Sequence, residues 1–112
     1  MGDVLSHTVD RDGDIVVVAL TGELDMSGFD ALVKILNEAA EQPGIARVHV
    51  DLGRVGFIDS KGMQALLVGC HAAERANVKF AVIRPQAHVR KVLGIAGLLD
   101  LLSGEQPCPP AT

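Results

Sequence analysis

One short segment of the chain combines a hydroxyl, a carboxylate and a glycine in a spacing that could support phosphate chemistry. The segment Phe57-Ile58-Asp59-Ser60-Lys61-Gly62 leads into a run with helical periodicity, so Ser60 is expected at the start of a helix. Free backbone N–H groups and the positive end of the helix dipole can bind a phosphate there. Gly62 would leave room for a phosphate or a partner to approach. The same spacing is typical of a serine that only caps the helix, and spacing alone favours that simpler interpretation.

Acidic groups are expected around Ser60. Asp59 precedes it directly, and Asp25 ends an upstream segment, Gly22-Glu23-Leu24-Asp25, which follows an apolar run. Parallel strands end along one edge of a sheet, so the loops that contain these two aspartates should converge. A functional site is therefore predicted at that edge.

The other side chains that could do chemistry lack a suitable spacing. No metal site is predicted, because the histidines and cysteines do not have metal-ligand spacing. These residues are His7, His49, His71, His88, Cys70 and Cys108. The Gly-x-Ser-x-Gly elbow of a serine hydrolase is absent, since Ile58 stands where its first glycine belongs. A Gly-x-x-x-x-Gly-Lys-Ser/Thr phosphate loop is absent too. We expect no catalytic residues, no cofactor and no enzymatic activity.

Cys70 and Cys108 are too few for a disulfide framework. The simpler interpretation predicts one buried, apolar cysteine and one exposed thiol in the C-terminal tail. A regulatory disulfide between the two is the alternative, and a mass measurement without reductant would test it.

Length and charge narrow the class of protein. The 112 residues, 48% of them apolar, suit one domain, and 10 basic against 14 acidic residues give a net charge of −4. Three Phe are the only aromatic residues, which argues against single-stranded nucleic acid as a ligand. The N-terminus lacks the pattern of a secretory signal, and the longest apolar run, 15–20, is too short to span a membrane. We expect a cytoplasmic protein without membrane insertion.

The hydrophobic patterns predict a single α/β domain in the order β-β-α-β-α-β-α-(β), with four to five strands in a mixed sheet and three to four helices. Strands are expected at 6–9, 15–20, 47–52 and 78–83. Helices are expected from Ser27 with Asp30 as a capping box, over 60–75, and from Pro85 as first helical residue. Residues 98–102 should form an edge strand or a closing turn, and 103–112 a flexible tail.

Two of the strands differ in pattern. The unbroken apolar run 15–20 predicts a central strand that is buried on both faces. The alternating run 47–52 predicts that one sheet face is incompletely covered.

The chain resembles the STAS domain family, and within it the bacterial anti-sigma factor antagonists. The resemblance rests on Gly22-Glu23-Leu24-Asp25, Val50-Asp51-Leu52, the segment from Phe57 to Gly62, and Gly97-Leu98-Leu99. It covers residues 5–102 and implies one STAS domain over 1–112. It also implies that the serine matching Ser60 is phosphorylated by a partner that is both anti-sigma factor and serine kinase, and that a PP2C-type phosphatase removes the phosphate.

Lys61 departs from the pattern, because phosphorylated antagonists usually have Ser or Thr after the acceptor serine. A cation is unfavourable at the positive end of a helix. Lys61 could pair with a phosphate on Ser60, pair with an acidic group of a partner, or project into solvent. The departure bears on which kinase recognises the site.

The mechanism that the resemblance implies is partner switching. The unmodified edge would bind the anti-sigma factor and release the sigma factor, and a phosphate beside the two aspartates would repel the partner. The expected contact surface adds the outward side of the second helix and consists of Asp25, Asp59, Ser60, Lys61, Gly62, Gln64, Ala65 and Val68. A monomer is the simplest expectation. The alternative is a STAS scaffold or regulatory subunit, stressosome-like or associated with a transporter.

Overall fold

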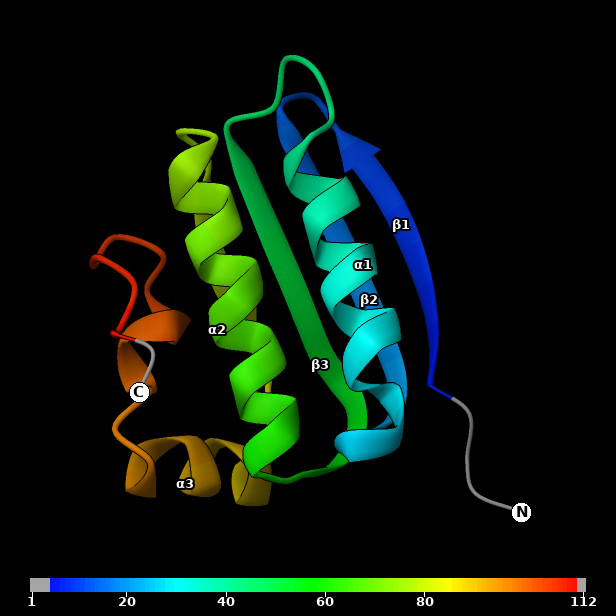
Figure 1. Cartoon of the computed structure of the whole chain (residues 1–112), viewed down its shortest axis with the longest axis vertical. Helices are drawn as coiled ribbons and strands as arrows, with labels where there is room; N and C mark the ends of the chain where they lie inside the picture. Colours follow the sequence, from blue (N-terminus) through cyan, green and yellow to red (C-terminus); the bar gives the residue numbers. More distant parts are fainter. Residues whose placement is uncertain (1–4, 111–112) are drawn as a thin grey trace.

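The computed structural model describes residues 5–110 and contains a four-stranded mixed sheet (Figure 1). Strand β1 pairs antiparallel with β2, while β2, β3 and β4 are parallel, in the spatial order β1-β2-β3-β4. The strands are β1 (Ser6–Asp12), β2 (Ile15–Leu24), β3 (Arg47–Ile58) and β4 (Lys79–Ile83). This arrangement confirms the predicted fold class and element order. Within 5–110 there is no fifth strand, because Leu99–Leu102 forms the 3-10 turn η2.

Two helices lie side by side on one face of the sheet, α1 (Phe29–Ala40) and α2 (Ser60–Arg75) (Figure 1). The third, α3 (Ala87–Ile95), lies at the end of the sheet where α1 and α2 begin. The bounds of α2 match the prediction. None of the helices in the described part of the chain has the length and apolarity that crossing a membrane requires.

The arrangement of the helices explains the burial of β2. Val16, Val18 and Leu20 are buried in one apolar cluster with side chains of α1 and α2. Ile15 and Val17, which alternate with them, are only half-buried. The prediction that β2 is buried on both faces is therefore wrong, because α1 and α2 cover the same face.

Strands β2 and β3 extend beyond their predicted ends at residues 20 and 52. They stay paired as far as Leu24 opposite Ile58, with register shifts between Ala19 and Thr21 and between Gly22 and Glu23. The shifts allow pairing to continue through glycine-rich segments that otherwise read as loops. The predicted site edge is therefore made of hydrogen-bonded strand ends.

The starts of two helices also differ from the prediction. The segment Met26–Gly28 is a 3-10 turn, η1, and α1 begins at Phe29. The Ser27 N–H and hydroxyl both donate to the Asp25 carboxylate, at 3.1 and 2.6 Å, so Asp25 caps η1 and no capping box forms. Pro85 precedes α3, whose N-cap residue is Gln86.

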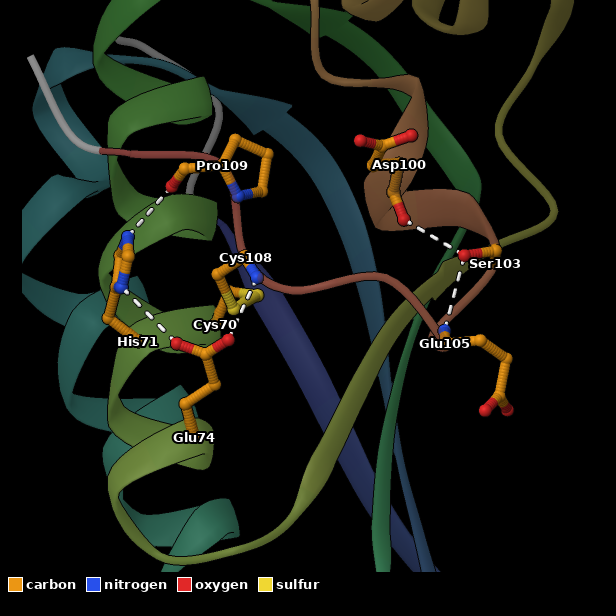
Figure 2. Close-up of a disulfide and its surroundings, with 8 residues drawn as sticks. All are labelled: Cys70, His71, Glu74, Asp100, Ser103, Glu105, Cys108 and Pro109. Carbon is orange, nitrogen blue, oxygen red and sulfur yellow. Dashed lines mark hydrogen bonds and ion pairs between the residues drawn. A yellow bond between two sulfur atoms is a disulfide. The ribbon is translucent and has the colours of Figure 1, made fainter.

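The C-terminal segment 103–110 packs against α2 and the sheet, contrary to the flexible tail that was predicted. Cys108 forms a disulfide with Cys70 of α2, and its N–H donates to the Glu74 carboxylate at 2.8 Å (Figure 2). The interpretation of two separate cysteines is therefore wrong, and the alternative pairing is the one observed. The disulfide and the hydrogen bond from the Cys108 N–H to the Glu74 carboxylate hold this segment on α2.

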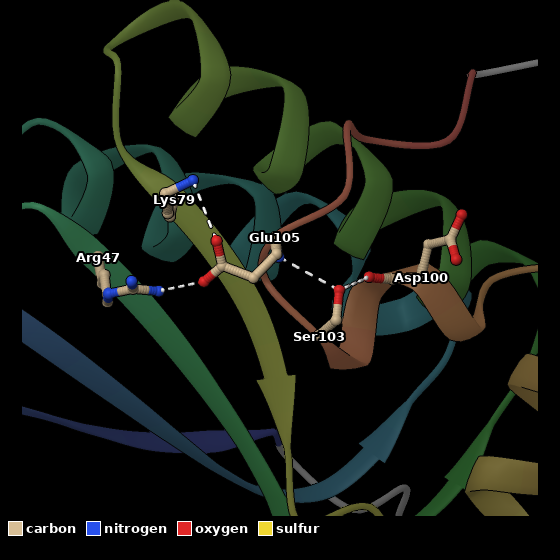
Figure 3. Close-up of polar contacts among 5 residues, drawn as sticks. All are labelled: Arg47, Lys79, Asp100, Ser103 and Glu105. Atoms are coloured by element: carbon tan, nitrogen blue, oxygen red, sulfur yellow. Dashed lines mark hydrogen bonds and ion pairs between the residues drawn. The ribbon is translucent and has the colours of Figure 1, made fainter.

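Glu105 attaches the same segment to the starts of two strands. Its carboxylate forms ion pairs with Arg47 at 3.2 Å and Lys79 at 3.4 Å (Figure 3). Hydrogen bonds from Arg47 and then Lys79 lower the pKa of Glu105. The segment is thus held at both the sheet and α2.

Asp51 is a buried acidic group on β3, with 8% of its surface exposed. Its carboxylate accepts the Gly53 N–H at 2.8 Å and forms an ion pair with Arg84. The hydrogen bond from Arg84 lowers the pKa of Asp51, and the bond from Gly53 acts in the same direction. The charged form is therefore the one that the fold stabilises.

We expect Asp51→Ala to destabilise the protein by about 1–3 kcal/mol at neutral pH, because the hydrogen bonds from the Gly53 N–H and Arg84 to the charged carboxylate are lost. The folded pKa lies below the unfolded value of about 3.9, so this stabilisation is complete above that value and is lost as pH falls through the folded pKa. Urea unfolding from neutral to strongly acidic pH measures the difference from wild type. The difference should shrink in acid, and a constant one would contradict the assignment. The exposed Asp10→Ala on β1 is the control.

Candidate functional site

The structure brings Asp25 and Asp59 to one edge of the sheet. Leu24 and Ile58, the last residues of β2 and β3, are paired, and each aspartate follows directly. The Asp59 N–H also donates to the Leu24 carbonyl at 3.0 Å. The convergence that parallel strands predict is therefore observed, although paired strand ends form it in place of loops.

Asp59, and not Ser60, caps α2. Its backbone is extended, and its side chain accepts the Gly62 N–H at 2.9 Å. Ser60 is the first helical residue, and its side chain is exposed. The simpler interpretation of Ser60 as a cap is wrong, because the preceding carboxylate takes that role.

Asp59→Ala should therefore cost about 1 kcal/mol of unfolding free energy, the usual effect of losing an N-cap. Asp59→Asn retains an acceptor oxygen and should lose only a few tenths of that amount. Ser60→Ala, one residue away, should leave stability within about 0.5 kcal/mol of wild type. Thermal unfolding of the three variants measures this order, and equal losses for Asp59→Ala and Ser60→Ala would contradict it.

Gly62 is buried where the start of α2 meets the end of β2. A Cβ atom on Gly62 would lie 2.2 Å from the Leu24 carbonyl oxygen. The space beside Gly62 is therefore filled by β2, and the expectation that it admits a phosphate or a partner is wrong.

Lys61 lies along the helix surface toward α1. Its ammonium donates to the Gln64 side-chain oxygen at 3.3 Å and lies 5.7 Å from the centre of the Phe29 ring. This cation–π contact favours the position of the Lys61 ammonium over Phe29 when Ser60 is not phosphorylated. Lys61 remains exposed at the rim of the site, next to Ser60.

The outward side of α2 contains only some of the residues expected there. Gln64 is exposed and Val68 is half-buried, whereas Ala65 is 0% exposed. Ala65 lies three residues after Gly62 and four before Gly69, where a Cβ would meet Leu36 of α1. Ala65 therefore lies on the same side of α2 as these two glycines and points into the core. It is not part of the contact surface, contrary to the prediction.

Two exposed apolar side chains that the predicted contact surface does not include flank the two aspartates. Met26 is 70% exposed and follows Asp25, and Phe57 is 47% exposed two residues before Asp59. Ile95, the last residue of α3, is 79% exposed. Their exposure could not be seen in the sequence, because it depends on where β2, β3 and α3 end.

A groove of about 400 Å³ lies beside Ser60, between α2 and the chain that follows α3. Its lining is contributed by the first two turns of α2, by residues after α3 and by the C-terminal segment: Ser60, Lys61, Met63, Gln64, Leu67, Ala96, Leu98 and Pro110. Exposed apolar side chains beside a groove are features that protein-binding surfaces often have.

Several solved structures have the same fold over most of the length of this chain. The anti-sigma factor antagonist SpoIIAA, solved in its unphosphorylated form, superposes with a TM-score of 0.73 at 23% identity over 87% of this chain and 85% of its own. A SpoIIAA from Bacillus, solved in the phosphorylated form, gives 0.66 at 22% identity over 87% and 88%. An anti-sigma factor antagonist from Mycobacterium paratuberculosis gives 0.78 at 20% identity over 92% and 88%.

Sequence comparison agrees. The candidate anti-sigma factor antagonist BtrV of Bordetella bronchiseptica is 26% identical over 94 residues, which are 84% of this chain and 80% of BtrV. The family model described as "Mlab, STAS domain" matches residues 7–103. A match over nearly all of the described residues, together with the fold, shows that the chain belongs to the STAS domain family.

Proposed function

We propose that this protein is an anti-sigma factor antagonist, which binds an anti-sigma factor and thereby releases a sigma factor. The likeness to BtrV and the shared fold with SpoIIAA support this role. The observation that carries it is the exposed Ser60 hydroxyl, which the Asp59 cap leaves unused at an edge with exposed Met26 and Phe57. The protein acts by binding, without catalysis and without nucleic acid, as a monomer in the cytoplasm.

Phosphorylation of Ser60 would switch the protein off. The anti-sigma factor acts as the serine kinase, and a PP2C-type phosphatase restores the free hydroxyl. A phosphate adds roughly −1.5 to −2 charges. The Asp59 carboxylate already occupies the Gly62 N–H, so the phosphate meets a like charge beside it as well as the helix N-terminus. The added charge repels an acidic partner surface at this edge, and burying it against an apolar partner surface costs desolvation free energy.

The contact surface is Asp25, Asp59, Ser60, Lys61, Gln64 and Val68, extended by Met26 and Phe57. Met26 lies just after the end of β2 and Phe57 near the end of β3, whereas Val68 lies on α2, so the partner would cover the strand ends as well as α2. A surface of this extent suits a transient complex.

The test is phosphorylation and binding with purified components. The full chain is incubated with ATP and candidate anti-sigma kinases, and mass spectrometry locates the phosphate, which we expect on Ser60. Ser60→Asp should weaken kinase binding at least tenfold, or about 1.4 kcal/mol, in calorimetry, while Ser60→Ala binds as wild type. Thr8→Asp adds the same charge at an exposed position of β1 and should have no effect.

Two results would oppose the proposal in different ways. A kinase that binds tightly but leaves Ser60 unmodified would rule out the phosphorylation switch. Failure of every candidate anti-sigma factor to bind would favour the alternative, a STAS scaffold or regulatory subunit.

A further inference from the structure

Cys108 of the disulfide belongs to a group of potential metal ligands that come from α2 and from the C-terminal segment (Figure 2). The His71 ring, the Glu74 carboxylate and the Cys108 sulfur each offer a ligand atom, and these three atoms lie within 4.8 Å of one another. His71 and Glu74 lie one turn apart on α2, and Cys70, bonded to Cys108, precedes them. Sequence spacing could not reveal this group, because its members come from α2 and from the C-terminal segment.

Hydrogen bonds already orient His71 and Glu74 as ligands. The Pro109 carbonyl lies 2.9 Å from His71 Nε2 and can only accept, so Nε2 carries the proton and the neutral ring keeps a lone pair on Nδ1. Glu74 Oε2 accepts the Cys108 N–H at 2.8 Å, which leaves Oε1 free. A carbonyl behind a histidine and a held carboxylate are the usual outer partners of a metal site.

The distance between the two unoccupied ligand atoms of His71 and Glu74 suits a zinc ion. Nδ1 of His71 and Oε1 of Glu74 are 3.7 Å apart, too far for a hydrogen bond. Zn–N and Zn–O bonds of about 2.0–2.2 Å at a tetrahedral angle place two such ligands about 3.4 Å apart. A shift of a few tenths of an ångström would therefore let both atoms bind one ion.

We propose that reduction of the Cys70–Cys108 disulfide turns this group into a zinc site, with His71 Nδ1, Glu74 Oε1 and the Cys108 thiolate as ligands. The Cys70 thiolate, released beside Cys108, would turn in as the fourth ligand. A dithiol supplies two electrons and two protons, the S–S bond breaks to two thiols, and the dithiol becomes a disulfide. Zinc then displaces both thiol protons. Two thiolates with one imidazole favour zinc over harder cations.

The site would keep the C-terminal segment on α2 under reducing conditions, where a disulfide does not persist. Four protein ligands leave no open position, which is typical of structural zinc. This inference goes beyond the proposed function, because zinc binding at Cys108 needs neither a partner nor Ser60.

The full chain, reduced with a phosphine and freed of metal, is titrated with Zn²⁺ against a chromophoric chelator. We expect one zinc per reduced chain and none for the oxidised chain. Co²⁺ as a probe should give thiolate-to-metal charge-transfer and tetrahedral d–d absorption. His71→Ala and Glu74→Gln should each weaken zinc binding at least tenfold, whereas the control His88→Ala on α3 should bind as wild type. Circular dichroism shows that each variant is folded.

Several outcomes would overturn the assignment. A reduced, folded wild type that binds no zinc rules the site out. Unchanged affinity in both His71→Ala and Glu74→Gln would mean that only the thiols bind, and loss of binding in His88→Ala would place the ion elsewhere.

Discussion

Gly62→Ala is expected to lower the free energy of unfolding by about 3 kcal/mol, the upper end of the usual cost of overpacking. The new methyl group would lie 2.2 Å from the Leu24 carbonyl oxygen and 2.7 Å from its carbon. These are backbone atoms, which cannot rotate away as a side chain could. The Leu24 carbonyl also accepts the Asp59 N–H, so moving it would disturb the start of α2 as well.

Urea unfolding of the full chain measures this effect. Gly56→Ala is a matched control, because a Cβ at this exposed position of β3 has no atom within 4 Å. The control should change stability by less than about 0.5 kcal/mol. Equal stability of the two variants would mean that the start of α2 can move away from β2 at little cost.

Reduction of the disulfide in the presence of a chelator should destabilise the protein by as much as about 4 kcal/mol. The bond joins residues 38 apart, and opening a loop of that length restores this much chain entropy to the unfolded state. For a domain of this size the loss corresponds to a fall in Tm on the order of 15 °C. The packing of the C-terminal segment on α2 should loosen at the same time.

Thermal unfolding with and without reductant provides the measurement. Cys108→Ser should resemble the reduced wild type and should not respond to reductant, which makes it the internal control. An identical Tm for oxidised and reduced wild type, with thiol titration confirming both states, would contradict this prediction.

The order of elements and the bounds of α2 could be predicted because they depend on local pattern. The periodic run over 60–75 is long and unbroken, which is where hydrophobic spacing is most informative. The ends of β2 and β3 could not be predicted in the same way. Gly22, Gly53 and Gly56 weaken strand propensity locally, while pairing between the two strands overrides it.

The location of the candidate site could be predicted from the sequence, but the contacts of its residues could not. Asp25, Asp59 and Ser60 were expected at one edge from strand topology alone. The close contact of Gly62 depends on the Leu24 carbonyl, which lies far upstream in the chain, and the same carbonyl accepts the Asp59 N–H. The burial of Ala65 depends on the phase of α2 against α1, and the disulfide on the course of the C-terminal segment.

The Leu24 carbonyl has a consequence for the speed of recognition. It joins the end of β2 to the first turn of α2, so the edge has its shape before any partner arrives. A preformed surface loses little conformational entropy on binding, and its association rate is then set by diffusion and charge. The protein would therefore discriminate between competing partners mainly through their dissociation rates. Added salt should alter the association rate more than the dissociation rate.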